Sequence, residues 1–257
     1  MQLGDQIDGT DNDDYFGRTS AMNFDGSVIA VAAVYDDDYF NPNGGFVQVF
    51  KYDPFRTTID GQSSVIGYNS TDPNYGVTGW TRLGTDIVAT AANSQLGFAT
   101  ALNDEGNILA ITAAADDDGG TDRGSVQVFE YKTFFQRGNQ GLKGDPIPGL
   151  TTEEYSGRSV SINSDATVVA IGSHHFDGGA GTGSGTTRIY EWNGTAWVLK
   201  GSQINGLTAG EESGTSVSIN STGTIVAIGA NSFDGGVGSN SGTTRIYEWN
   251  GTAWVLK

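Results

Sequence analysis

The stretch SGTTRIYEWNGTAWVLK occurs twice without a change, at residues 184–200 and at residues 241–257. A long, unchanged duplication marks a repeat protein, and the rest of the chain aligns with these copies as four related units. The units start near residues 16, 96, 156 and 213. Each begins at a matched glycine, and these are Gly17, Gly97, Gly157 and Gly214. The repeated unit therefore decides the fold class of the whole chain.

The third unit shows the strand pattern that all four units share. Two β-branched runs, SVSIN and TVVAIG, are separated by a tight polar turn, which predicts a hairpin. The alternating run TTRIYEW follows, and Asn193-Gly194 then supplies the positive φ of a second hairpin turn. Residues 196–204 make a fourth strand. Four strands in a unit of about 60 residues are typical of a β-propeller blade.

We therefore predict an all-β chain in which residues 1–257 form a single β-propeller domain of four four-stranded antiparallel blades. Residues 54–79 interrupt the first blade with an insertion rich in Gly, Ser and Asn. The N-terminal residues QLGDQIDG match the linker LKGSQING, and the C-terminal residues AWVLK begin a fourth strand. Pairing of these two terminal segments is expected to close the ring. A longer repeat array and blades shared between chains are the alternatives.

Two of the units carry a known repeat signature. FGRTSAMNFDGSVIAVAAV in the first unit and SGTSVSINSTGTIVAIGA in the fourth resemble the FG-GAP repeat of the integrin α-subunit propeller. The stretch RIYEWNGTAWVLKGSQINGL resembles a version of this repeat in surface proteins of marine bacteria and of their viruses. The resemblance implies an integrin-like propeller and says little about function, because propellers carry many unrelated activities. FG-GAP repeats often hold calcium between their first and second strands, but turns such as FDGS are too short here to wrap an ion.

The formal net charge of −17, from 30 acidic and 13 basic residues, limits the classes of partner. Nucleic acid and anionic bilayers would repel this surface, so neither is an expected partner. The absence of cysteine excludes disulfides and thiolate metal sites. No apolar run reaches the roughly 20 residues of a membrane helix, and no signal peptide is recognisable near Met1. We expect an extracellular protein on a cell surface or, since a signal peptide is missing, on a virion.

The acidic residues concentrate on one predicted face of the propeller. Loops that link blades, and loops between second and third strands, emerge on the same side. The linking loops supply the ligand-face candidates Asp11, Asp13, Asp14, Glu153, Glu154, Glu211 and Glu212. The second-to-third loops supply candidate Ca²⁺ ligands, which are Asp36, Asp37, Asp38, Asp116, Asp117 and Asp118. The alternative interpretation is an acidic, well-solvated rim that keeps the protein soluble.

Two sets of rings also have alternative interpretations. Recurrent tryptophans either stack on sugar rings, as in a lectin, or pack between blades. These tryptophans are Trp192, Trp197, Trp249 and Trp254. The only two histidines, His174 and His175, are neighbours in one loop. Adjacent residues of an extended segment point in opposite directions, so we predict exposed loop residues that share no metal.

The chain offers little for covalent catalysis. It has no cysteine, a single histidine pair and no Gly-rich phosphate-binding motif, so no Ser/His/Asp site can be assembled. Near-identical units favour a repeated binding surface, because an active site needs different residues from different blades. We therefore predict a non-enzymatic recognition, adhesion or structural module with a protein or glycan ligand. The alternatives are a carbohydrate-binding lectin and a polysaccharide-degrading enzyme built on two carboxylates.

Overall fold

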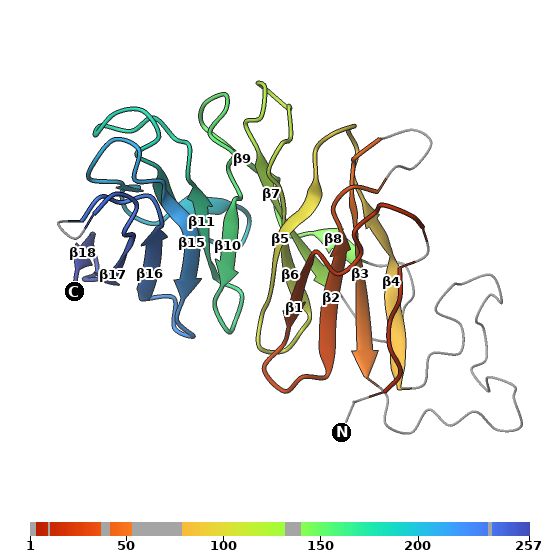
Figure 1. Cartoon of the computed structure of the whole chain (residues 1–257). Helices are drawn as coiled ribbons and strands as arrows, with labels where there is room; N and C mark the ends of the chain where they lie inside the picture. The colour runs from red at the N-terminus through yellow and green to blue at the C-terminus, as the bar shows by residue number, and fades with distance from the viewer. Residues whose placement is uncertain (1–3, 10, 37–41, 53–78, 132–139, 236–237) are drawn as a thin grey trace, which may run out of the picture.

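The computed structural model describes residues 4–9, 11–36, 42–52, 79–131, 140–235 and 238–257. The regular elements in these ranges are β-strands, and they form four antiparallel sheets that follow one another along the chain (Figure 1). Sheet 1 contains β1 (Thr19–Met22), β2 (Val28–Ala33), β3 (Phe46–Tyr52) and β4 (Trp80–Val88). Sheet 2 contains β5 (Leu96–Leu102), β6 (Ile108–Ala113), β7 (Ser125–Tyr131), β8 (Gln140–Leu142) and β9 (Ile147–Pro148).

Sheets 3 and 4 come from the two most similar units. Sheet 3 contains β10 (Ser159–Ile162), β11 (Val168–Ser173), β12 (Thr186–Trp192), β13 (Trp197–Leu199) and β14 (Ile204–Asn205). Sheet 4 contains β15 (Ser213–Ile219), β16 (Ile225–Ala230), β17 (Thr243–Trp249) and β18 (Trp254–Leu256). The prediction of an all-β chain built from antiparallel, blade-like sheets is confirmed, and the arrangement is consistent with a β-propeller-like fold.

The hydrophobic core lies between the sheets, in one layer per junction. Val47 and Leu109 belong to the layer between sheets 1 and 2. Ile189 of sheet 3 packs with Ile228 in the layer between sheets 3 and 4. The strand β11 is buried along its whole length, in keeping with its largely apolar sequence VVAIGS. Burial of apolar area on both faces of a sheet is therefore the main force that stacks the sheets.

The fourth strand of a unit differs from the prediction of one continuous strand over residues 196–204. It consists of two short pieces, β13 and β14, and both pair with β12. Trp197 lies opposite Trp192, while Ile204 lies opposite Thr187. Gly201 has a φ of 76°, so the chain bends between the two pieces. Sheet 2 shows the same division into β8 and β9.

An asparagine side chain closes the turn between the first and second strands in every sheet. Asn163 Oδ1 accepts a hydrogen bond from the backbone nitrogen of Val168 at 2.8 Å. The same bond closes the turns at Asn23, Asn103 and Asn220. The Asn-x-x-Gly and Asn-x-x-Ala turns of the sequence are therefore one repeated local structure.

These turns also join each sheet to the next one. The backbone nitrogen of Phe24 donates to the carbonyl oxygen of Asp104, and Asp104 N donates to Ser164 O. Ser164 N in turn donates to Ser221 O, and all three distances are 3.3 Å. The row of sheets is thus held along one edge by a series of equivalent backbone bonds.

The two ends of the chain lie at opposite ends of the row of sheets (Figure 1). Strand β18 is the outer strand of sheet 4 and pairs with β17. At the other end, Gly4 lies beside Gly79 at the start of β4. The expected pairing of the terminal segments is therefore not formed by the described residues, because the turn from sheet to sheet does not bring the first and last sheets together. The insertion at residues 54–79 lies outside the described residues except for Gly79.

In the described part of the chain, no helix has the length and apolar character needed to cross a membrane.

A substitution at Gly157 can test the close contact between sheets 2 and 3. An ideal Cβ at this position would lie 2.7 Å from the Cβ of Thr112, and its φ is 93°. Gly194, in an exposed turn, has a φ of 101° with nothing within 4 Å of such a Cβ. We expect Gly194→Ala to cost about 1 kcal/mol of unfolding free energy through backbone strain alone. Gly157→Ala should cost about 1–3 kcal/mol more, because the methyl group collides with sheet 2.

Urea unfolding of both variants measures the difference, and equal losses would show that the sheets do not approach at this glycine.

Candidate active site

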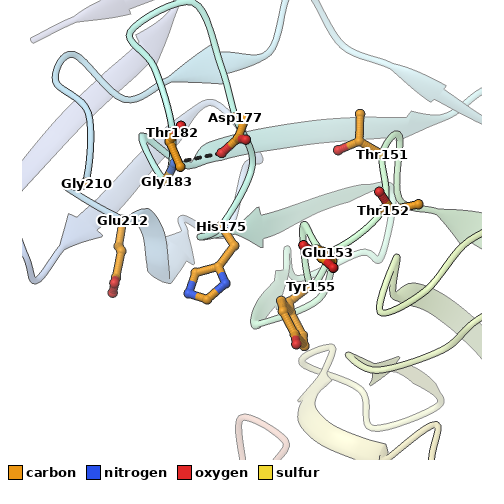
Figure 2. A pocket seen from close by; sticks show the side chains of 10 residues that line it. All are labelled: Thr151, Thr152, Glu153, Tyr155, His175, Asp177, Thr182, Gly183, Gly210 and Glu212. Carbon is orange, nitrogen blue, oxygen red and sulfur yellow. Dashed lines mark hydrogen bonds between the residues drawn. The ribbon is translucent and has the colours of Figure 1, made fainter.

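A cavity of about 640 Å³ opens at the junction of sheets 3 and 4, on the side of the linking loops. Three segments line it, and they are the linker into β10, the loop between β11 and β12, and the linker into β15 (Figure 2). The lining residues are Thr151, Thr152, Glu153, Tyr155, His175, Asp177, Thr182, Gly183, Gly210 and Glu212. The lining therefore combines three carboxylates with one imidazole and one phenol.

Backbone hydrogen bonds between loops hold one side of the cavity. Gly210 N donates to Thr182 O at 2.9 Å, and Glu212 N donates to Gly183 O at 3.0 Å. Asp177 Oδ1 accepts a bond from Gly183 N at 2.8 Å, which Figure 2 shows as a dashed line. The linker into sheet 4 is thus tied directly to a loop of sheet 3, so the cavity lining is anchored on two sheets.

The other side is formed by the linker into β10, where left-handed residues alternate with a buried one. Glu153 has a φ of 59° and Tyr155 has a φ of 50°. Between them, Glu154 is buried in the protein. Because the backbone reverses at each step, the Glu153 and Tyr155 side chains line the cavity and Glu154 points inward.

The histidine pair lies in a turn directly after β11 and not in an extended segment. The two imidazole rings lie against each other with centroids 4.1 Å apart, so the prediction that the side chains point in opposite directions is wrong. His174 is half-buried, whereas His175 is exposed and lines the cavity. Tyr155 meets His175 edge-on at 5.3 Å, and its hydroxyl donates to Asp122 Oδ2 at 3.0 Å.

Burial controls the ionisation of two rings at this corner. It lowers the pKa of His174 to about 3, and the nearby charges of His175 and Arg158 act in the same direction. Burial also raises the pKa of Tyr155, as does the hydrogen bond to Asp122. His174 is therefore a neutral imidazole and Tyr155 a neutral phenol at pH 7.

Glu154 was predicted as a ligand-face residue, and that prediction is wrong. Its side chain is 0% exposed and forms an ion pair with Arg188, which is 1% exposed. Thr151 N also donates to Glu154 Oε2 at 3.0 Å. The buried Glu154 carboxylate neutralises the Arg188 guanidinium, whose burial without an opposite charge would be strongly unfavourable.

Glu211 occupies the matching place in sheet 4 and is corrected in the same way. It is 1% exposed and accepts bonds from both Arg245 terminal nitrogens, at 2.6 and 3.0 Å. Burial alone would raise the pKa of Glu211, but the bonds from Arg245, Leu207 N and Thr208 lower it below its usual value. Asp14, at the corresponding position before sheet 1, is 4% exposed. These three acids are structural and are not available to a ligand at the surface.

The remaining ligand-face candidates separate into two groups. Glu153 and Glu212 both line the cavity, and Asp177 joins them from the loop after β11. Asp11 and Asp13 are exposed in the linker into β1, where they lie outside this cavity. The loop face of the junction between sheets 3 and 4 thus brings together carboxylates from three separate segments.

The candidate calcium ligands are engaged in closing their own loop. Asp116 Oδ2 accepts a bond from the Ser125 hydroxyl at 2.6 Å, and Asp117 Oδ1 accepts one from Asp122 N at 2.7 Å. Asp118 is exposed. No group of three or more His, Asp or Glu side chains that could hold a metal ion occurs in the described ranges. Asp36 is described, but Asp37 and Asp38 lie outside the described residues.

The four tryptophans form two pairs that pack against the preceding sheet. Trp192 and Trp197 have centroids 5.3 Å apart, and Trp197 Nε1 donates to Lys143 O at 2.7 Å. The Lys143 ammonium lies over both rings of this pair. Trp249 and Trp254 repeat the arrangement, with Trp254 Nε1 donating to Lys200 O at 2.8 Å. Packing between blades accounts for these residues without a sugar ligand.

Tyr155 and His175 both line the cavity, although the sequence pattern predicts only an exposed loop residue at His175 and assigns no role to Tyr155. One signal pointed to them. His174 and His175 stand where the fourth unit has Asn231 and Ser232, within two units that are otherwise nearly alike. The two copies therefore differ chemically at this position.

Comparison with solved structures identifies proteins of the same fold. One is a periplasmic gluconolactonase from Pseudomonas aeruginosa, with a TM-score of 0.57 and 10% identity over 98% of this chain and 58% of that one. Another, from Bacteroides fragilis, is assigned as a 6-phosphogluconolactonase, with a TM-score of 0.52 and 12% identity over 93% of this chain and 52% of that one. The chain therefore spans little more than half the length of either protein. The sequence matches no protein-family profile and no curated protein.

The prediction of a non-enzymatic recognition, adhesion or structural module is contradicted, because the two solved proteins described above are named as lactonases. They also provide no evidence for the FG-GAP or integrin-like assignment beyond the shared propeller-type fold. At identities of 10% and 12%, the likeness establishes the fold alone.

The buried ion pair gives a direct stability prediction. Glu154→Ala leaves the Arg188 guanidinium buried without its counter-charge, so it should lower the unfolding free energy by about 3–5 kcal/mol. Glu248→Ala is the control, because Glu248 and Lys257 form a largely exposed pair whose loss should cost about 0–1 kcal/mol. Urea unfolding at neutral pH compares the two variants, and similar losses would contradict the structural role of Glu154.

His174 makes stability depend on pH. Unfolded chains bind a proton at the ordinary histidine pKa of 6.5, whereas folded His174 binds it only near pH 3. The unfolded state thus binds more protons in this window, so stability falls as pH drops from 6.5 towards 3. We expect this residue to account for about 1 kcal/mol of the loss at pH 4.5, after allowance for its partial exposure.

His174→Gln should reduce the slope of melting temperature against pH between pH 7 and 4.5, relative to the unsubstituted chain. An unchanged slope in His174→Gln would show that His174 is not held neutral by the fold.

Proposed function

We propose that the chain is a hydrolase that opens the ring of a small, uncharged, polyhydroxylated lactone in the cavity around His175. The observation that carries the proposal is the exposed imidazole of His175 inside a polar cavity of about 640 Å³. A cavity of this volume is of the size that takes a small ligand. The shared fold with two proteins named as lactonases supports the same reaction class.

Ring opening needs only water and proton transfer. His175 takes a proton from water while the water oxygen attacks the lactone carbonyl carbon. The ring carbon–oxygen bond then breaks, and the imidazolium returns the proton to the leaving ring oxygen. The product is an open-chain hydroxy acid, and one water molecule is the only co-reactant consumed. Histidine is suited to both transfers because it gains and loses protons near neutral pH.

The other lining groups fit a polyhydroxylated ring. Thr152 and Thr182 present hydroxyls that can both donate and accept hydrogen bonds. Glu153 and Glu212 flank His175 from opposite sides in Figure 2, and carboxylates accept bonds from sugar hydroxyls. Tyr155 lies against the edge of the His175 ring and fixes its position. These residues are proposed to orient the substrate, while His175 moves the proton.

The charge of the cavity favours an uncharged substrate. Its lining contains Glu153, Asp177 and Glu212, and it contains no lysine or arginine. A phosphorylated lactone would be repelled by these carboxylates, whereas an uncharged lactone would not. Hydrolysis creates a carboxylate, so the same repulsion would help the product to leave. This reasoning favours a gluconolactone over its 6-phosphate as substrate class.

A location outside the cytoplasm is part of the proposal. One of the two solved relatives is named as a periplasmic protein. Fractionation of the source cells followed by detection of the chain would test this location.

A pH-stat assay with glucono-lactone tests the activity, with the spontaneous hydrolysis in buffer subtracted. His175→Gln should lower kcat by at least about 100-fold, because it removes the only group proposed to carry the proton. Glu248→Gln changes an exposed carboxylate on β17, outside the cavity lining, and should leave the rate unchanged. No rate above buffer for the natural chain, or equal rates for both variants, would overturn the proposal.

The double variant Glu153→Gln and Glu212→Gln tests the charge argument. It should improve the ratio of kcat/KM for the 6-phosphate over the uncharged lactone by about 5–10-fold, since two like charges are removed. Release of reducing sugars from a polysaccharide, in place of acid from a lactone, would instead favour a glycosidase with Glu153 and Glu212 as its carboxylates.

A further inference from the structure

The outer face of sheet 4 is uncovered, although its sequence copies a face that is buried elsewhere in the chain. Strand β17 repeats β12 residue for residue. Ile189 on β12 is 1% exposed because sheet 4 covers it, and it packs with Ile228. Ile246, its counterpart on β17, is 45% exposed. Sheet 4 therefore presents a copy of a docking surface whose natural cover, the next repeat, is visible inside the same chain.

The backbone of this face is also shaped for a neighbouring sheet. An ideal Cβ on Gly172 of β11 would lie 2.9 Å from the carbonyl carbon of Gly214 in the next sheet. Gly229 is the matching residue of β16, and the atoms near its ideal Cβ belong only to Ser216 of the same sheet. Gly229 is thus a glycine although, within the described residues, no backbone of another sheet approaches it. A glycine at this position would let the backbone of a further sheet come close.

The N-terminal segment at residues 4–9 has the local structure of a linker that follows a sheet. Its sequence GDQIDG matches GSQING at residues 201–206. Gln6 Nε2 donates to Asp8 Oδ1 in the first segment, and Gln203 Nε2 donates to Asn205 Oδ1 in the second. Ile7 packs against the cluster of Val31, as Ile204 packs with Ile228.

Residues 201–206 include β14, which pairs with the start of β12. Among the described residues, no strand pairs with residues 4–9. Residues 4–9 therefore resemble β14 and the residues around it, but they have no neighbouring strand that corresponds to β12.

The first sheet exposes apolar residues where later sheets bury them. Met22 of β1 is 62% exposed, while Ile219 at the matching place of β15 is 8% exposed. Phe24, in the turn after β1, is 86% exposed. The series of turn-to-turn backbone bonds runs from Phe24 through Asp104 and Ser164 to Ser221. Its next member would join the backbone nitrogen of Ser221 to the carbonyl oxygen of a further Phe24.

From these four observations we propose that the outer face of sheet 4 binds sheet 1 and residues 4–9 of a second copy of this chain. The two ends of one chain lie apart in Figure 1, so one copy does not cover its own face. Two copies joined head to tail at both ends form a closed pair with two equal junctions.

The repeat predicts the contacts of this junction. Thr186 lies opposite Asn205 and Thr187 opposite Ile204 within sheet 3. By the same register, Thr243 of one copy lies opposite Asp8 of the second, and Thr244 lies opposite Ile7. Ile246 is then covered in the way that Ile189 is, with Met22 of the second copy at the edge of the contact.

Sedimentation equilibrium of the 257-residue chain measures the assembly. We expect a mass of about twice the 26.9 kDa of one chain. Each chain carries a net charge of −17, so the pair should be tighter at about 1 M NaCl, where repulsion is screened, than at about 0.1 M. A single-chain mass at all concentrations and salts would overturn the proposal, and a series of larger species would overturn the closed pair.

Substitutions separate the two faces. Ile246→Glu at the tail and Met22→Glu at the head should each weaken the pair by at least about 100-fold, because each buries a charge in an apolar contact. Leu142→Glu is the control, since Leu142 is 48% exposed on the outer edge of sheet 2. An equal mixture of the two weakened variants retains one intact junction and should restore the two-chain mass. If Met22→Glu alone stays paired, the contact is tail to tail and the proposal is wrong.

A disulfide distinguishes a second copy from the chain's own N-terminus. The natural chain has no cysteine, so the double variant Asp8→Cys and Thr243→Cys introduces only the pair that should meet. Oxidation should give a covalent species of two chains on a non-reducing gel. A covalent link within one chain would show that four sheets close on themselves, and no link at all would show that this register does not form. Neither result depends on whether the cavity hydrolyses a lactone.

Discussion

Close backbone approach between successive sheets is the constraint on which the rest of the molecule depends. A strand such as β11 is buried on both faces, so a sheet of this kind is stable only when neighbours cover it. The cover comes close enough that Gly185, with a φ of 75°, has room for a hydrogen but not for a Cβ beside Ser213. The same need explains why Gly124 stands beside Ser156 one junction earlier. Side chains fill the layer between sheets, and at its edge the glycines allow the two backbones to approach closely.

This packing decides which acids of the linkers reach solvent. The linker enters each sheet through a buried polar residue, which is Glu154 in sheet 3 and Glu211 in sheet 4. Both carboxylates meet an arginine of the third strand, so the charge is used to satisfy the interior. The residues on either side of Glu154 then turn outward with positive φ. The acidic cavity is thus a consequence of how the linker crosses a sheet edge, and it is not simply a collection of surface charge.

The strand content and the sheet order could be predicted because both follow from local patterns that recur in four copies. The burial of Glu154 and Glu211 could not be predicted from composition, since a Glu-Glu pair in a linker does not indicate which of its carboxylates is buried. A pairing signal was nevertheless present: Arg188 and Arg245 occur in the two units with a linker glutamate, while units one and two carry Gln48 and Gln127 there. Closure of the ring is not seen in the described residues, and matching sequences at two ends show only that the two segments are compatible.

The position of the cavity also answers the argument that near-identical units cannot form an active site. That argument compares equivalent positions, whereas a junction combines non-equivalent ones. The cavity takes a loop from sheet 3 and the linkers into both sheets. Tyr155 and Glu212 occupy matching places before their glycines, yet they lie on two different sides of the same cavity. Because His175 has Ser232 as its counterpart, a single change in one copy is enough to give this junction an imidazole that the next repeat lacks.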